Sequence, residues 1–500
     1  MKKAKITAEK SNVVSKIDKR IYGSFVEHVG RGIYTGIYEP GHPEADEAGF
    51  RKDVLKLVKE LDVPIVRYPG GNFVSNYDWE DGVGPVAERP KRLSLAWGVI
   101  EDNEIGLNEF SDWSKKSGAE TMMAVNLGTR GIAEARDLVE YCNYPSGTKF
   151  SDLRIKHGYK DPHKIKTWCL GNEVDGPWQI GHRDAREYGA VARESAKIMR
   201  LVDPSIELVA CGTVGRKMPT FGSWEETVLN ECYDFVDYMA IHCYYGNAGD
   251  DQSFLSMAEE TDEFIKAEAA VCDAIKYKLN KKKTMMISVD EWNVSYHKTP
   301  PDPSVEKTSR RLEEHYFVED AVVVGTMMIS IINNADRVKI GCLSSLVNTV
   351  APIMTEPGGG VWKQTIYYPY LHASRYGRGA ALRLDIDSPK YSCRDFTDVS
   401  QIVAAAVNNE EKSELTFFIV NRHLSDIIEI EINLIGFNSA GLIEALTFGH
   451  SDTKQSNGPD ESKNITPVNL TGVIINNNIL NCFLNPVTWN TIRIKYKIKV

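Results

Sequence analysis

Eight short runs of β-branched and apolar residues recur through the first three quarters of the chain, and they constrain its fold more than any other feature. They occupy residues 21–25, 64–68, 121–126, 164–170, 206–211, 236–242, 284–290 and 337–343. Their starts lie roughly 30 to 60 residues apart, which leaves room for one strand and one helix in each interval. Apolar residues return at every third or fourth position, as in an amphipathic helix, within 50–61, 132–141, 184–201 and 258–279.

Parallel strands need crossover connections, and eight strands joined by helices can close on themselves. The sequence therefore predicts an α/β fold built on a (β/α)8 barrel of the TIM type. A doubly wound open sheet is the alternative.

The pattern changes after about residue 384 from alternating helices and strands to strands alone. Segments 415–420, 427–434 and 489–500 have the period of β-strands, and no long helix intervenes. This is typical of an antiparallel β-sandwich, here expected to be jelly-roll-like, and the strand-like segment 3–14 can add an edge to it. We therefore divide the chain into a strand at 1–18 that joins the sandwich, a barrel at 19–380 and a sandwich at 381–500. The polar interval 451–464 predicts a long surface loop.

Polar residues follow the predicted barrel strands, at the end where active sites form in barrels of this kind. Glu173 follows the fourth strand, and Glu291 follows the seventh. Hydrolysis of a glycosidic bond needs two carboxyls, one to protonate the leaving oxygen and one to attack or to activate water. Each residue also has an ordinary structural explanation, because glutamates in loops are mostly solvated and histidines at strand ends are often buried and hydrogen-bonded.

Charge and hydropathy exclude several classes of function. The chain carries 59 basic and 69 acidic residues, a net charge of −10, without a long basic run, so we expect no nucleic-acid partner. The longest apolar run, 321–332, is too short for the roughly 20 residues that cross a bilayer. The basic start at Lys2 and Lys3 is not followed by the apolar stretch of a secretory signal. We therefore expect a cytoplasmic protein with no membrane segment.

Motifs for cofactors and metals are also missing from the sequence. The nine cysteines form no Cys-x-x-Cys pair, and there is no phosphate-binding loop, dinucleotide-binding glycine pattern or His-Glu-x-x-His motif. Separate strands of a barrel can still supply metal ligands, but no spacing calls for them. We expect metal-free acid/base chemistry with no cofactor.

Four motifs carry a resemblance to a known family. They are Tyr22-Gly23-Ser24-Phe25-Val26-Glu27-His28, Arg67-Tyr68-Pro69-Gly70-Gly71-Asn72-Phe73, Trp168-Cys169-Leu170-Gly171-Asn172-Glu173 and Asp290-Glu291-Trp292-Asn293-Val294. Further likeness lies in 351–356, 364–369 and 388–391. Over nearly its whole length, the chain resembles glycoside hydrolase family 51, the α-L-arabinofuranosidases.

The resemblance implies a barrel with a β-sandwich made from the C-terminal part and the extreme N-terminus. It also implies an exo-acting enzyme that releases terminal non-reducing α-L-arabinofuranosyl residues from arabinan or arabinoxylan oligosaccharides, with retention of configuration. Glu173 is then the general acid/base and Glu291 the nucleophile. The substrate-binding residues expected beside them are Glu27, Asn72, Asn172, His242, Tyr244 and Trp178. Family members are typically hexamers, which implies a homo-oligomer.

These roles place opposite requirements on the two carboxyls. Glu173 must be protonated at working pH, so we predict a pocket that raises its pKa. Glu291 must stay ionised, and a donor such as Tyr244 can help it to do so.

Three positions depart from the family pattern. The chain has Cys243, Ser295 and Ser345 where family members often have Gln, Trp and Gln. The two glutamates are retained, but the loss of a sugar-binding amide and of an aromatic ring on the leaving-group side changes the pocket. A β-xylosidase or an endo-β-glucanase using the same glutamates stays an alternative. A non-catalytic sugar-binding protein is a further alternative, although it would need one of the glutamates lost.

Overall fold

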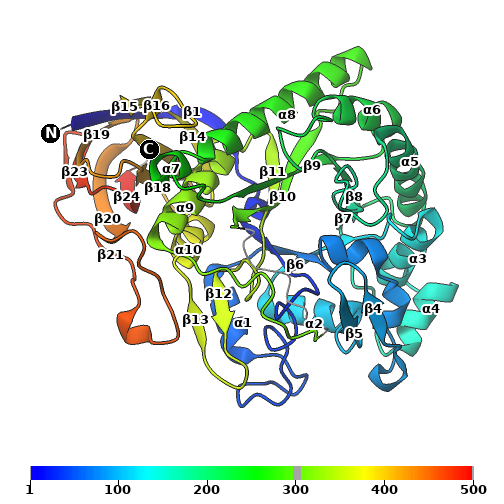
Figure 1. Cartoon of the computed structure of the whole chain (residues 1–500). Helices are drawn as coiled ribbons and strands as arrows, with labels where there is room; N and C mark the ends of the chain where they lie inside the picture. The colour runs from blue at the N-terminus through cyan, green and yellow to red at the C-terminus, as the bar shows by residue number, and fades with distance from the viewer. Residues whose placement is uncertain (1, 297–305, 498–500) are drawn as a thin grey trace.

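Eight parallel strands form a closed barrel at the centre of the molecule (Figure 1). The computed structural model describes residues 2–296 and 306–497. Around the barrel the strands follow the order β10-β11-β2-β3-β6-β7-β8-β9. Their bounds are β2 (Gly23–Phe25), β3 (Ile65–Tyr68), β6 (Glu120–Ala124), β7 (Thr167–Leu170), β8 (Glu207–Cys211), β9 (Tyr238–Tyr245), β10 (Met286–Val294) and β11 (Val338–Leu343). All eight predicted strands are present, so the barrel is confirmed and the open sheet is wrong.

Helices cover the outside of the barrel (Figure 1). Their bounds are α1 (Lys52–Leu61), α2 (Leu107–Ser117), α3 (Ile132–Asn143), α4 (Lys149–Lys156), α5 (Ala185–Val202), α6 (Ser223–Cys232), α7 (Asp251–Leu255), α8 (Ala258–Lys278), α9 (Val318–Asn333) and α10 (Tyr367–Tyr376). The four predicted helices correspond to α1, α3, α5 and α8. In α1 the buried residues Val54, Leu55, Val58 and Leu61 recur at helical spacing, which is why this segment coils against the barrel.

The long apolar run of the sequence is the helix α9. Its residues from Val318 to Ile332 are all buried, as expected of a helix that is hydrophobic on every side. It packs against β14, β17, β18 and β24, and Figure 1 shows it between the barrel and the second sheet. A Cβ on Gly325 would lie 2.4 Å from the Trp489 ring, so the absence of a side chain permits this close packing. No helix among the described residues is long and apolar enough to cross a membrane.

The second unit is one sheet of ten strands, in the order β21-β20-β24-β18-β17-β14-β1-β19-β23-β22. The bounds are β1 (Lys2–Lys16), β14 (Ala380–Asp387), β17 (Ile402–Asn409), β18 (Glu414–Asn421), β19 (Ile428–Ile435), β20 (Asn438–Phe448), β21 (Val468–Asn469), β22 (Ile474–Asn476), β23 (Ile479–Leu484) and β24 (Thr488–Lys497). The sheet curls so that β20 contacts β22, and it encloses an apolar core of its own. The predicted sandwich is therefore confirmed.

The N-terminal strand differs from its prediction as an edge. β1 lies in the middle of the ten strands, antiparallel to β14 and parallel to β19. The sequence could not distinguish these positions, because Ala4, Ile6 and Ala8 point into the core in either case. The last predicted strand is β24 as far as Lys497, and residues 498–500 lie outside the described part. The division of the chain at residues 18 and 380 stays a prediction.

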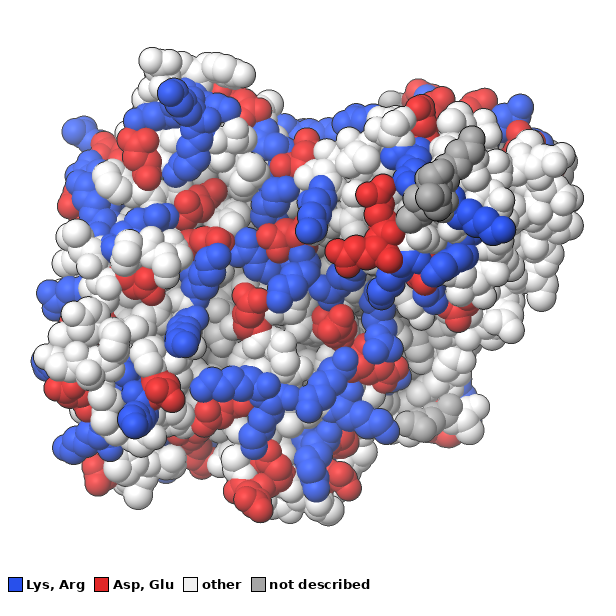
Figure 2. All heavy atoms as spheres, turned by 180° about the vertical axis from the view of Figure 1, so that it is seen from behind, with Lys and Arg blue, Asp and Glu red and all other residues white. Residues whose placement is uncertain are grey.

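In the part of the chain that the structure describes, three two-stranded sheets lie in the connections. They pair β4 (Arg92–Ser94) with β5 (Val99–Glu101), β12 (Ile353–Thr355) with β13 (Val361–Lys363), and β15 (Lys390–Tyr391) with β16 (Val399–Ser400). The interval 451–464 contains a single 3-10 turn, Glu461–Lys463, and no strand. Figure 2 shows that charges of both signs are interspersed over the face opposite to that in Figure 1.

Candidate active site

A cavity of about 470 Å³ opens at the carboxyl ends of the barrel strands. Glu27, Asn72, Glu173, Tyr244 and Glu291 line it, and they belong to the ends of five different strands, β2, β3, β7, β9 and β10. Two strands are longer than predicted, since β9 continues to Tyr245 and β10 to Val294. Tyr244 and Glu291 therefore lie within strands, as predicted for His242, and not in the loops that follow, so ladder hydrogen bonds fix their backbone.

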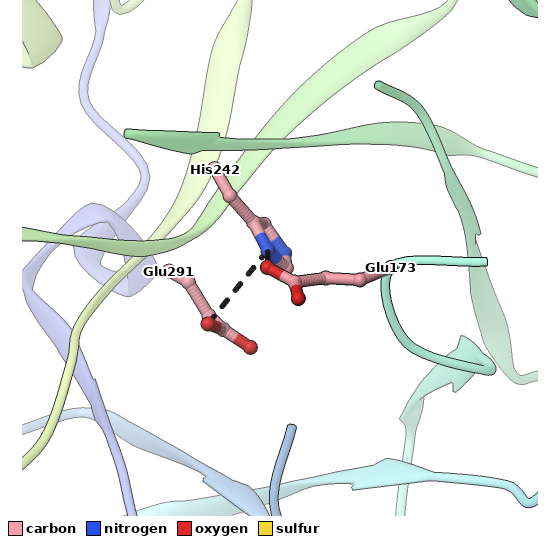
Figure 3. Close-up of side chains that lie close together, drawn as sticks. All are labelled: Glu173, His242 and Glu291. Atoms are coloured by element: carbon pink, nitrogen blue, oxygen red, sulfur yellow. Dashed lines mark hydrogen bonds and ion pairs between the residues drawn. The ribbon is translucent and has the colours of Figure 1, made fainter. Parts of the chain in front are cut away.

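Glu173 and Glu291 come together around His242, as Figure 3 shows. Nδ1 of His242 lies 2.9 Å from Oε1 of Glu173 and 3.7 Å from Oε2 of Glu291. One nitrogen or oxygen atom from each of the three side chains lies within 4.8 Å of the other two. The barrel thus brings into one cluster three residues that are far apart in the sequence.

Both oxygens of Glu291 accept hydrogen bonds, one from the buried Arg67 and one from the half-buried Tyr244. Nη1 of Arg67 donates to Oε1 at 2.6 Å, and the Tyr244 hydroxyl donates to Oε2 at 2.9 Å. Nη2 of the same guanidinium donates to Oδ1 of Asn172 at 2.8 Å. These bonds hold the Glu291 carboxylate in one orientation, and Tyr244 is the donor that the sequence predicted.

Glu173 is held by two nitrogen donors at the mouth of the cavity. Besides His242, the indole Nε1 of Trp178 donates to its Oε2 at 3.0 Å, while the Trp178 ring remains 55% exposed. Burial would raise the pKa of Glu173, but the hydrogen bond and positive charge of His242 outweigh it and bring the pKa below its ordinary 4.5. The predicted upward shift of this pKa is therefore wrong, because the prediction did not include a cation beside the carboxyl.

Gly70 and Gly71 leave room for the carboxyl groups of Glu27 and Glu291, because neither has a side chain. A Cβ on Gly70 would lie 2.3 Å from Cγ of Glu27, and one on Gly71 would lie 2.9 Å from Oε1 of Glu291. The backbone N–H of Phe73 and the indole Nε1 of Trp97 both donate to Oε1 of Glu27, at 2.8 and 3.1 Å. Burial raises the pKa of Glu27 to about 7, and the charge of Glu291 adds to this effect.

We expect the Glu27→Gln variant to be more stable than the natural protein at alkaline pH. With a folded-state pKa of about 7 against an ordinary 4.5, the folded protein binds more protons between these values, so its stability falls as pH rises through this window. Glutamine cannot lose a proton, and its oxygen can accept the same two hydrogen bonds. At pH 8 the gain in unfolding free energy is at most about 3 kcal/mol. Thermal unfolding at pH 4 and pH 8 measures it.

The matched control for this experiment is Glu101→Gln. Burial would raise the pKa of Glu101, but His28 outweighs it and lowers that pKa, so this substitution should destabilise the protein at pH 8. A Glu27→Gln variant that is no more stable than the natural protein at pH 8 would contradict the prediction.

Comparison with known proteins places this geometry in a family. Residues 57–268 match the α-L-arabinofuranosidase 1 domain, and residues 290–487 match the α-L-arabinofuranosidase C-terminal domain. Intracellular exo-α-(1→5)-L-arabinofuranosidases of Halalkalibacterium halodurans and Bacillus subtilis are each 55% identical, over 99% of this chain and 99% of their own. The solved family 51 α-L-arabinofuranosidase of Bifidobacterium longum is 40% identical, with a TM-score of 0.95 over 99% of both chains.

The chain belongs to the family 51 α-L-arabinofuranosidases. It is therefore a glycoside hydrolase, and the resemblance found in the four sequence motifs is confirmed. A further family structure, the arabinose complex of the Thermotoga maritima enzyme, has a TM-score of 0.89 at 31% identity over 98% of this chain and 99% of its own.

Two residues of this arabinofuranosidase site were given no role from the sequence. Arg67 is a fully buried cation inside β3, and an arginine within an apolar strand was a signal that could have singled it out. Trp97 lies in the turn between β4 and β5, and its indole reaches Glu27. No local pattern marks Trp97, because short exposed strands leave only a weak signal in the sequence.

The predicted amide residues lie at the site in different ways. Asn172 is buried, with its Oδ1 on Arg67 and its Nδ2 without a partner among the described residues. Asn72 is half-buried and lines the cavity.

The three departures from the family pattern have different surroundings. Cys243 is buried in the large apolar core that barrel and helices share, and it does not line the cavity, so the change at this position does not alter the cavity wall. Ser295 and Ser345 do line the cavity, and Oγ of Ser295 donates to Oε1 of Glu314 at 3.2 Å. The pocket therefore differs from the family pattern at two wall positions.

The spacing of Glu173, His242 and Glu291 would also suit a metal ion. His242 is a poor candidate as a ligand, because burial would lower its pKa but the charge of Glu291, the nearby Asp290 carboxylate and the hydrogen bond to Glu173 raise it well above 6.5. We assign no metal to these residues, and the expectation of a metal-free reaction stays a prediction.

Proposed function

We propose that this α-L-arabinofuranosidase releases terminal non-reducing arabinofuranosyl residues by double displacement with retention of configuration. The observation that carries the proposal is the close approach of Glu173 and Glu291, whose nearest oxygens lie within 4.8 Å of each other. Retaining glycosidases hold their two carboxyls about 5 to 5.5 Å apart, whereas inverting enzymes leave about 6.5 to 9.5 Å for a water molecule.

In the first step, one oxygen of Glu291 attacks the anomeric carbon while the bond to the leaving oxygen breaks. Glu173 gives a proton to that oxygen, so the leaving group departs as a neutral alcohol. In the second step Glu173 takes a proton from water, and the water oxygen displaces Glu291 from the sugar. Arg67 and Tyr244 support this sequence, because they orient the attacking carboxylate through both of its oxygens.

The substrate-binding roles follow from the cavity wall. Glu27 and Asn72 line the cavity and supply a carboxylate and an amide for the sugar hydroxyls, and Trp178 offers an exposed ring at the mouth for the leaving sugar. Asn172 lies behind Gly71 of that wall, with its Nδ2 3.4 Å from where a Cβ on Gly71 would be, and we assign it the same role. We infer α-(1→5)-linked arabino-oligosaccharides as substrates, because the two relatives at 55% identity are named for that linkage. Both are also named intracellular, which supports a cytoplasmic site of action. The hexameric assembly is proposed from the family resemblance.

The stereochemistry of transfer tests the mechanism. With α-(1→5)-L-arabinotriose as donor and methanol as acceptor, we expect methyl α-L-arabinofuranoside as the product. Its anomeric proton identifies the configuration in the proton NMR spectrum. Release of the β anomer would contradict double displacement. Aryl β-D-xyloside and a β-glucan serve as control substrates, and efficient hydrolysis of either in place of the arabinoside would favour the alternative specificities.

A further inference from the structure

Asp290 is a buried carboxylate that the proposed mechanism does not use. It directly precedes Glu291 on β10, and successive side chains of a regular strand point to opposite faces. Here both carboxylates contact the same residues, because the pairing of β10 with β9 and β11 shifts register around them. This strand irregularity brings a second negative charge under the catalytic cluster.

Asp290 lies behind the cluster, away from the cavity wall. It is 1% exposed and does not line the cavity. Its Oδ1 lies 3.3 Å from Nε2 of His242, and its Oδ2 lies 3.5 Å from Nε of Arg67 and 3.6 Å from Sγ of Cys169. The imidazole of His242 is thus placed between Asp290 on one nitrogen and Glu173 on the other.

We propose that Asp290 is a positioning residue that keeps the catalytic proton on the His242–Glu173 pair by holding His242 as an imidazolium. The inference rests on the proposed function, in which Glu173 delivers a proton to the leaving oxygen. In the free enzyme one proton is shared across the 2.9 Å hydrogen bond between Nδ1 of His242 and Oε1 of Glu173.

In the first step one proton moves and the net charge of the cluster is conserved. The proton passes from Nδ1 of His242 to the Glu173 carboxyl, and from there to the leaving oxygen, which keeps the electron pair of the broken bond. His242 becomes neutral as Glu291 becomes an ester, so the net charge of the cluster does not change. In the second step, the proton that water loses returns to the pair.

Negative groups surround the imidazole on more than one side. The carboxylates that face His242 are Glu173 and Asp175 after β7, and Asp290 and Glu291 on β10. The Arg67 guanidinium on β3 and the Cys169 thiol on β7 lie beyond Asp290. Burial alone would disfavour the imidazolium, but these carboxylates outweigh it and raise the pKa of His242. Glu173 and Glu291 change their charge during the cycle. Asp290 touches no substrate atom and keeps its charge throughout.

The experiment is the pH dependence of kcat/KM for Asp290→Asn on two substrates. With α-(1→5)-L-arabinobiose, whose leaving group needs a proton, we expect the alkaline limb to move at least one unit to lower pH, a loss of tenfold or more at its alkaline end. With 4-nitrophenyl α-L-arabinofuranoside, whose phenolate leaves unaided, the limb should stay in place. Cys169→Ala is the matched control, since it removes a contact to Asp290 without a charge, and both limbs should stay in place.

An equal loss on both substrates with no movement of the arabinobiose limb would overturn the proposal, because that result is expected if Asp290 only anchors Arg67. If Asp290→Asn does not fold, nitrogen-15 NMR of the histidine-labelled natural enzyme decides the matter. We expect His242 to be an imidazolium at pH 7, with its signals identified by their loss in His242→Gln, and a neutral ring would overturn the proposal. Failure of the natural enzyme to release arabinose from either substrate would instead contradict the proposed function.

Discussion

The Glu291→Ala variant is expected to lose hydrolysis of every arabinofuranoside, whatever its leaving group, by on the order of 10⁵-fold in kcat. The reason is that no covalent intermediate can form without the carboxylate, and a better leaving group does not restore the missing nucleophile. Steady-state rates with arabinobiose and with 4-nitrophenyl arabinofuranoside should fall alike. Added azide can attack the sugar directly in the space left by the side chain, and the azide product should then have inverted configuration.

The control for the loss of a buried carboxyl is Glu225→Gln. Glu225 is fully buried, does not line the cavity, and accepts hydrogen bonds from the backbone and hydroxyl of Thr213. This variant should keep the activity of the natural enzyme. Residual activity of Glu291→Ala above one per cent of the natural rate, in protein shown to be free of contaminating enzyme, would contradict the nucleophile assignment.

The sequence was sufficient for the barrel because strands and helices leave separate periodic patterns. Eight apolar runs at regular intervals allow few other folds, and the polar residues after them mark the end of the barrel that holds the site. The pairing of β1 was not predictable in the same way. Its alternation shows which side chains are buried, but it does not show whether the strand lies at an edge or at the centre of a sheet.

Individual site residues could be predicted only where they belong to a recognisable sequence motif. Glu173 and Glu291 stand in motifs, but their relation to His242 depends on where β7, β9 and β10 lie in the closed barrel. Asp290 shows this limit most clearly. Strand alternation places it on the face opposite Glu291, and only the register shifts of β10 bring both carboxylates to His242 and Arg67. The direction of the Glu173 pKa was missed for the same reason.

The Glu173→Ala variant should distinguish substrates by their leaving groups, which separates its role from that of Glu291. Hydrolysis of arabinobiose should fall by on the order of 10³-fold, because its leaving alcohol cannot depart without a proton. Glycosylation by 4-nitrophenyl arabinofuranoside should be nearly unaffected, since the phenolate leaves unaided. The second step then becomes slow, because no base activates the water. A burst of nitrophenol followed by a slow steady state is the expected time course.

Azide tests the second step of the reaction in the same variant. A small anion that enters the space left by the Glu173 carboxylate needs no base, so it should attack the glycosyl-enzyme and restore turnover of the nitrophenyl substrate. Because this attack follows a first displacement by Glu291, the arabinofuranosyl azide should have retained configuration, opposite to that expected from Glu291→Ala. His242 is unpaired from Glu173 in this variant but still faces Asp290 and Glu291. Rescue with an inverted product, or equal losses on good and poor leaving groups, would show that Glu173 is not the acid/base.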